Sequence, residues 1–190
     1  DDDFDAYSNN GDVVAAPHWD AFVGTAELST EPAFSGASSI KIPATDTALC
    51  ALTGGHPGVA ASTLSETNPL IVTVMYFDAD STVGAVSGVG LRTGLSYGAW
   101  TGGTWGATAF QDFFSMGPFT PTNATNYHLR VVEGGGWQDT TLARETGWRE
   151  FQLVITDTTV TANVDCGDVA ITDQFDLDVT EFISMRLGDF

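Results

Sequence analysis

The sequence predicts an all-β protein built as a sandwich of two antiparallel sheets. Two observations carry this prediction. Apolar and polar residues alternate in residues 149–157 and again in residues 159–165, so each segment has the one buried and one solvated face of a β-strand. In addition, about ten to thirteen short strand-like segments follow one another along the chain, and none reads as a long amphipathic helix.

Residues 147–172 form the most regular part of the chain. The polar step Asp157-Thr158 separates two alternating segments, as an antiparallel hairpin requires, and Asp165-Cys166-Gly167 turns the chain into a third strand at residues 169–171. Three such strands need a second sheet to cover their apolar face. The apolar positions expected on that face are Phe151, Leu153, Ile155, Val160, Ala162 and Val164.

Further strands are expected on either side of this hairpin. Residues 70–77, LIVTVMYF, are a continuous apolar and β-branched run, which is typical of a central strand covered on both faces. Residues 8–12 are expected to form a turn, and residues 140–146 are the best helical candidate. No linker or repeat divides residues 1–190, which predicts one domain. The other expected strands lie at residues 23–30, 35–43, 85–93, 127–133 and 181–190.

The charge of the chain excludes several classes of partner. It has 25 Asp and Glu residues against 6 Lys and Arg residues, for a net charge of −19. Such a surface repels nucleic acids and anionic membranes. It is typical of a protein that stays soluble in a salty or calcium-rich medium, and it also allows Asp residues to bind divalent cations. No apolar run has the length of a transmembrane span, so no membrane insertion is expected.

The first residue and the cysteines bear on the compartment. The chain begins at Asp1 without an initiator Met, which suggests a processed protein that is secreted or held at the cell surface, or else a trimmed chain. Cys50 and Cys166 are an even count, which in an exported protein predicts a disulfide. Closing that loop would stabilise the fold by about 4 kcal/mol. The alternative is two buried free thiols.

Several motifs together resemble one superfamily. They are DDFDAY at residues 2–7, FSGASSIKI at residues 34–42, VTANVDCG at residues 160–167 with Trp148 leading the strand before it, and the ending ISMRLGDF. These segments resemble the concanavalin A-like lectin/glucanase superfamily, in its laminin G-like jelly-roll branch. The resemblance implies a two-sheet antiparallel jelly-roll β-sandwich over residues 1–190.

The resemblance also has implications for the termini and the cysteines. The family pairs its first and last strands, so residues 2–7 and 184–190 are expected to be neighbours. It implies a structural calcium ion there, held where Asp2, Asp3 or Asp5 meets Asp189. Cys166 stands between Asp165 and Gly167, a departure from the family pattern that fits a bridge to Cys50.

A second candidate metal site lies at the end of the apolar strand. Asp78 and Asp80 in FDAD are two residues apart, so in a strand both carboxylates face the same way. Enzymes of the resembled superfamily that cleave polysaccharides carry a pattern like E-x-D-x-x-E, which is missing here. Calcium coordination by oxygen ligands is therefore the preferred reading of this pair over acid–base catalysis, and a solvated acidic face is the alternative.

The best candidate ligand site is the glycine- and aromatic-rich stretch at residues 98–114. Flat aromatic rings with small neighbours can stack on sugar rings, and we expect Trp100, Trp105 and Trp137 to do so. The alternative is that these rings fill the core, the role we assign to Trp19 and Trp148.

These observations predict an exported acidic jelly roll that binds rather than cleaves. The leading interpretation is a carbohydrate-binding or adhesion module stabilised by calcium. One alternative is a structural subunit of an extracellular filament, sheath or surface layer, in which edge strands pair between copies of the chain. Another is a polysaccharide hydrolase or lyase whose site follows no recognised pattern. The expected partners are carbohydrate or other copies of the protein.

Overall fold

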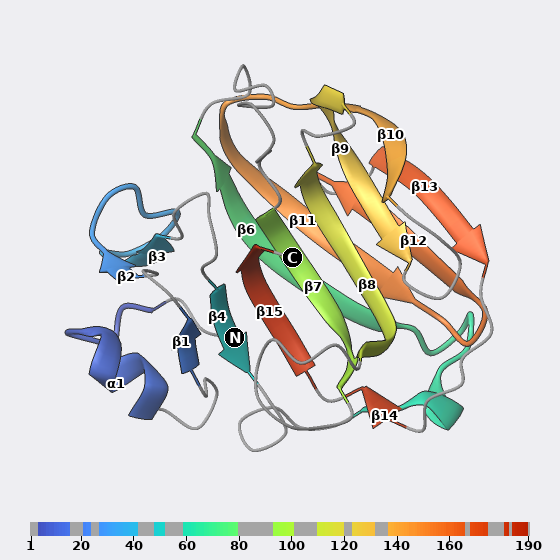
Figure 1. The fold of residues 1–190 in the computed structure, drawn as a ribbon, viewed down its shortest axis with the longest axis horizontal. Helices are drawn as coiled ribbons and strands as arrows, with labels where there is room; N and C mark the ends of the chain where they lie inside the picture. Colours follow the sequence, from blue (N-terminus) through green and yellow to red (C-terminus); the bar gives the residue numbers. More distant parts are fainter. Residues whose placement is uncertain are drawn as a thin grey trace.

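The protein consists mainly of antiparallel β-sheet with little helix, as the sequence predicts (Figure 1). Two short helical segments, α1 (Asn10–Ala15) and η1 (Ala61–Thr63), are the helices of the described part. The computed structural model describes residues 4–15, 21–23, 27–41, 48–51, 59–79, 93–100, 110–119, 123–131, 137–165, 168–174, 181–182 and 184–189.

The larger sheet has seven strands, and neighbouring strands in it are antiparallel. The strand from near the C-terminus, β15, lies inside this sheet between strands from distant parts of the sequence (Figure 1). The order is β1 (Ala21–Val23), β4 (Ala48–Ala51), β15 (Ser184–Asp189), β7 (Thr93–Trp100), β8 (Phe110–Phe119), β9 (Asn123–Val131) and β10 (Trp137–Ala143).

The second sheet has four strands and contains the hairpin that the alternating pattern predicts. Its order is β13 (Asp168–Gln174), β12 (Thr159–Val164), β11 (Gly147–Ile155) and β6 (Leu70–Asp78). Two small two-stranded sheets pair β14 (Glu181–Phe182) with β5 (Val59–Ala60) and β2 (Glu27–Ser29) with β3 (Ser39–Lys41).

The two large sheets share one hydrophobic core. In Figure 1 they lie one in front of the other, and apolar side chains from both enter the same buried cluster. Tyr127 of β9 contacts Phe151 of β11 edge-on with 5.0 Å between ring centroids, and Tyr76 of β6 stacks on Phe151 at 4.7 Å. Burial of each large apolar side chain contributes about 1.5–3 kcal/mol. All six apolar positions that the sequence assigns to the inner face of the hairpin are buried: Phe151, Leu153, Ile155, Val160, Ala162 and Val164.

Strand β6 differs from its expected central position. It stands at the end of the described four-stranded sheet, where β11 is the strand it pairs with. Ile71 and Thr73 are exposed on one of its faces, whereas Val72 is buried on the other. The run of β-branched residues therefore predicts a strand but not its burial on both faces. Burial depends on which other parts of the chain pack over the strand.

The helical expectations were wrong in two places. Residues 140–143 of the helical candidate belong to strand β10, where they continue an antiparallel pairing with β9. A helix instead begins in the segment expected to be a turn. The Asn9 side chain accepts a hydrogen bond from the Asp12 backbone N–H at 3.2 Å, and the Asp12 carboxylate accepts one from Ser8 N–H at 2.9 Å, so both side chains cap α1.

The expected pairing of the two terminal segments takes a different form in the described residues. Residues 4–7 form a turn, and β15 has β4 and β7 as its neighbours. Phe4, Tyr7 and Leu187 of β15 nevertheless pack against the same buried side chain, Val13 of α1. The two ends of the chain are therefore joined by apolar contacts around Val13.

Candidate functional site

Several residues assigned to sites from the sequence lie outside the described residues: Trp105, Asp2, Asp3, Asp80 and Cys166. The proposed disulfide and the terminal calcium site therefore stay predictions. Four others are placed as backbone positions within strands of the seven-stranded sheet: Cys50, Trp100, Trp137 and Asp189. Trp100 of β7 pairs with Phe110, and Trp137 of β10 pairs with Arg130, so two strands separate the two tryptophans.

Asp5 connects the start of the chain to the loop before β3. Its Oδ1 atom accepts hydrogen bonds from the backbone N–H groups of Ala37 and Ser38, each at 2.8 Å. Gly36 has a φ of 64°, and a Cβ atom there would lie 1.6 Å from Asp5 Oδ2, so only glycine lets the carboxylate approach this loop. This geometry gives Asp5 a structural role, and its part in the terminal calcium site stays a prediction.

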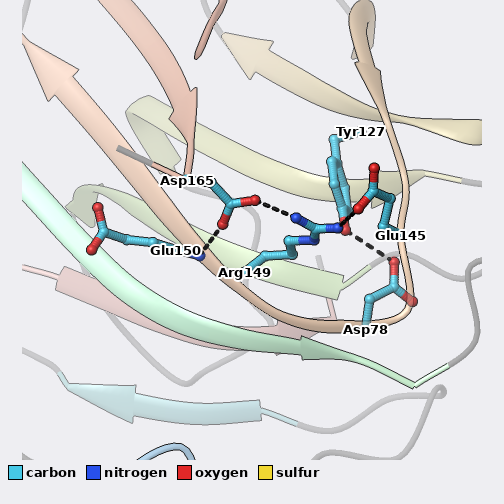
Figure 2. Close-up of polar contacts among 6 residues, drawn as sticks. All are labelled: Asp78, Tyr127, Glu145, Arg149, Glu150 and Asp165. Atoms are coloured by element: carbon cyan, nitrogen blue, oxygen red, sulfur yellow. Dashed lines mark hydrogen bonds and ion pairs between the residues drawn. The ribbon is translucent and has the colours of Figure 1, made fainter. Parts of the chain in front are cut away.

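Asp78 forms a buried ion pair. Its side chain shares the inward face of β6 with Val72 and Tyr76, and 1% of the residue is exposed. Arg144, in the turn between β10 and β11, donates from Nε to Asp78 Oδ2 at 2.9 Å and from Nη2 to Oδ1 at 2.8 Å. The Tyr127 hydroxyl donates to Asp78 Oδ2 at 3.3 Å (Figure 2).

The charges of this pair balance each other. Burial opposes the charged form of Arg144, but its hydrogen bonds to Asp78 outweigh burial and hold its pKa above the ordinary value. Burial and the adjacent Asp78 charge raise the pKa of Tyr127, so its hydroxyl stays protonated. A carboxylate already matched by a guanidinium is a poor calcium ligand, and the described residues contain no group of three His, Cys, Asp or Glu side chains that could hold a metal ion.

A second charged cluster lies beside this pair. The Arg149 guanidinium contacts the carboxylates of Asp165 and Glu145, and Asp165 Oδ1 also accepts the Glu150 backbone N–H at 3.1 Å (Figure 2). Burial opposes the charged form of Arg149, but these hydrogen bonds raise its pKa. The small pocket next to Arg149 is thus lined by charges that already pair with each other, and the arrangement joins β10, β11 and β12.

His128 and Asp139 form a third polar contact, on neighbouring strands β9 and β10. His128 Nε2 lies 2.6 Å from Asp139 Oδ1, and the imidazole is fully buried whereas 55% of the Asp139 side chain is exposed. Burial lowers the pKa of His128, and the Asp139 charge offsets this only in part. His128 is therefore neutral at pH 7 and donates its Nε2–H to Asp139.

The outer face of the four-stranded sheet carries an aromatic cluster, made of Phe34, Phe77 and Trp148. The Trp148 ring meets Phe77 edge-on at 5.2 Å and Phe34 edge-on at 5.6 Å. Phe77 and Trp148 are cross-strand partners on β6 and β11, and Phe34 reaches them from the loop before β3. Phe34 is 55% exposed, so part of the cluster faces solvent.

The assignment of Trp148 to the core was therefore wrong. Trp148 shares its strand parity with Glu150 and Gln152, which face away from the buried side chains Phe151 and Leu153. The outward orientation of Trp148 therefore already follows from the alternating pattern that predicts β11. The contact with Phe34 could not be read from the sequence, because residues 34 and 148 come together only through the tertiary fold.

A row of polar side chains crosses the same outer face. Thr73, Gln152 and Asn163 stand side by side on β6, β11 and β12. Asn163 Nδ2 donates to Gln152 Oε1 at 3.1 Å, and Gln152 Nε2 donates to Thr73 Oγ1 at 3.4 Å. The outer face therefore combines exposed aromatic surface with ordered amide and hydroxyl groups.

Comparison of the chain with protein-family models, with curated proteins and with solved structures found no match. Among the described residues, no helix is long and apolar enough to cross a bilayer. The outer face of the four-stranded sheet and the charged clusters are therefore the features from which a function can be inferred.

Proposed function

We propose that this protein is a carbohydrate-binding or adhesion module, secreted or held at the cell surface, that binds its ligand without cleaving it. We further propose that its two large sheets form a jelly-roll sandwich of the concanavalin A-like, laminin G-like type. The shared core of the two antiparallel sheets and the hairpin led by Trp148 support this fold. The net charge of −19 supports exclusion of nucleic acids and anionic surfaces as partners.

The observation that carries the proposal is the exposed aromatic cluster on the outer face. The C–H face of a pyranose packs well against an aromatic ring, and Phe34 offers such a surface beside Trp148. Amide and hydroxyl groups from Gln152 and Thr73 stand on the same face and can bond sugar hydroxyl groups. The proposed site is thus on the four-stranded sheet, and sugar stacking by Trp100, Trp105 and Trp137 stays a separate prediction.

Binding without cleavage fits the surroundings of Asp78. A glycosidase needs one carboxyl group as acid and a second as base or nucleophile, both reaching the substrate. Asp78 is instead buried and bonded in two places to Arg144. Its geometry supports a structural role over catalysis.

A glycan array followed by affinity measurements tests the proposal. Phe34→Ala removes an exposed ring and is expected to weaken glycan binding about tenfold, equivalent to about 1.4 kcal/mol, while the melting temperature changes little. Thr141→Ala is the control, because Thr141 is exposed on β10 in the other large sheet. Equal affinity of Phe34→Ala, Thr141→Ala and the wild type for every bound glycan would refute the site.

Calcium remains a proposal for the terminal residues Asp2, Asp3, Asp5 and Asp189. A ligand that binds only the folded state raises its stability in proportion to the logarithm of its concentration. Adding calcium to chelated protein is therefore expected to raise the melting temperature. If the melting temperature does not change up to millimolar calcium, the protein has no stabilising calcium site.

The edge of β6 favours a second candidate function, that of a structural subunit. Residues 70–77 carry no charge, Ile71 is exposed, and within the described sheets β6 pairs only with β11. An uncharged edge strand can pair with the same strand of another copy. Light scattering after size-exclusion chromatography would then show dimers or polymers that Ile71→Lys dissociates, whereas a monomer at all concentrations would exclude this role.

A further inference from the structure

The outer face of β11 presents its side chains in a line. Trp148, Glu150, Gln152 and Val154 occupy alternate positions, opposite the buried face of the strand. At about 3.3 Å per residue, Trp148 and Gln152 are roughly 13 Å apart along the strand. A single sugar ring cannot contact both residues, whereas a chain of several linked pyranoses can.

The polar row at the far end of this line is ordered before any ligand arrives. The hydrogen bonds from Asn163 to Gln152 and from Gln152 to Thr73 fix the direction of the Gln152 amide. An amide nitrogen carries two N–H groups, so Gln152 keeps one donor for a ligand, and the Thr73 hydroxyl keeps its hydrogen. Side chains held in place in this way lose little conformational entropy on binding.

The chemistry of the line favours an uncharged ligand. Glu150 is the one formally charged side chain among the outward positions of β6 and β11, and it is acidic. A polyuronate would meet this carboxylate within a chain whose net charge is −19, and would be repelled. The outward positions concerned are Ile71, Thr73, Met75, Phe77, Trp148, Glu150, Gln152 and Val154.

We infer that the ligand of the proposed site is an unbranched, uncharged oligosaccharide, a trisaccharide or longer, that lies along β11. One ring contacts the aromatic cluster at Phe34 and Trp148, and a ring further along the chain bonds to Thr73 and to Gln152, whose amide Asn163 holds in place. This inference rests on the proposed carbohydrate-binding function and adds the length, direction and charge of the ligand.

The test is calorimetry with a length series of a neutral glycan that the array identifies, from monosaccharide to hexasaccharide, and with an oligouronate. Affinity is expected to rise up to the trisaccharide or beyond, and the oligouronate is expected not to bind. Gln152→Ala is expected to weaken binding of the longer chains about tenfold and to leave the monosaccharide affinity unchanged. Gln138→Ala, which removes an amide from β10 in the other sheet, serves as the matched control.

The outcomes separate the two proposals. Binding that depends on Phe34 but neither increases with chain length nor responds to Gln152→Ala would overturn the inference and leave the carbohydrate site standing. Equal affinity for the oligouronate would do the same. If no glycan binds in a manner that depends on Phe34, both the inference and the proposed function fail.

Discussion

At the scale of single residues, the Asp78–Arg144 pair shows how a residue identified from its neighbours in sequence acquires its role from a distant one. The spacing of two residues groups Asp78 with Asp80, because in a strand both carboxylates would face the same way. In the structure the partner of Asp78 is Arg144, 66 positions along the chain, and the pair is closed off from solvent. Sequence spacing can point to a neighbouring carboxylate, but it cannot identify an arginine this far along the chain.

Asp78→Asn is expected to destabilise the protein by about 3–5 kcal/mol, because it leaves the buried Arg144 charge without a counterion. Urea unfolding measures this change, with Asp157→Asn in the exposed hairpin turn as a control that should stay within about 0.5 kcal/mol. The double variant Asp78→Leu with Arg144→Met removes both charges and should be more stable than Asp78→Asn. A loss below about 1 kcal/mol in Asp78→Asn would contradict the ion pair.

His128 makes the stability of the protein depend on pH. Its folded pKa is lowered by burial, so the native imidazole stays neutral while the unfolded one takes up a proton below about pH 6.5. The contribution of His128 to the free energy of unfolding is therefore fully present above about pH 6.5. Below that pH it falls by at most about 1.4 kcal/mol per pH unit.

The variant His128→Gln removes this titration. Its free energy of unfolding is expected to fall less steeply than that of the wild type between pH 7 and pH 5. Parallel pH profiles for the two proteins would show that His128 is not buried in its neutral form.

At the scale of elements, local sequence patterns predict that a segment forms a strand better than they predict where that strand lies in its sheet. The hairpin of β11 and β12 followed from an alternation within adjacent residues, and its inner face is buried as expected. The apolar and β-branched sequence of residues 70–77 predicts a strand at the centre of a sheet, yet β6 stands at the end of the described sheet. Helix α1 was missed although Asn9 and Asp12 have the spacing of a helix cap.

The loop that carries Phe34 depends on Gly36. Gly36→Ala forces a side chain into a positive φ and against the Asp5 carboxylate, so a loss of about 1–3 kcal/mol is expected. Asp5→Ala is the matched background, since it keeps the positive φ of residue 36 and removes the carboxylate that the added Cβ would meet.

A double-mutant cycle isolates the contact with Asp5. Thermal unfolding should show a larger loss when Gly36→Ala is introduced into the wild type than when it is introduced into Asp5→Ala, and glycan affinity should fall in Gly36→Ala because Phe34 shifts with its loop. Equal losses of stability in the two backgrounds would mean that Asp5 does not anchor the loop.

At the scale of the whole molecule, the sequence predicts the class of the fold but not the position of the proposed binding surface. Antiparallel all-β structure follows from strand patterns that each span fewer than ten residues. The aromatic cluster instead joins residues 34, 77 and 148, which no local pattern connects. The composition of residues 98–114 points to Trp100 and Trp105 because aromatic content is visible in a sequence, and their role in sugar binding stays a prediction.

The most direct test of the central claim is to map the ligand on the protein by NMR. Backbone amide shifts are recorded during titration with a neutral oligosaccharide. The largest changes in chemical shift are expected at Phe34, along residues 148–154 of β11, and at Thr73 and Asn163. Changes confined to β7 and β10 of the seven-stranded sheet, around Trp100 and Trp137, would contradict the claim.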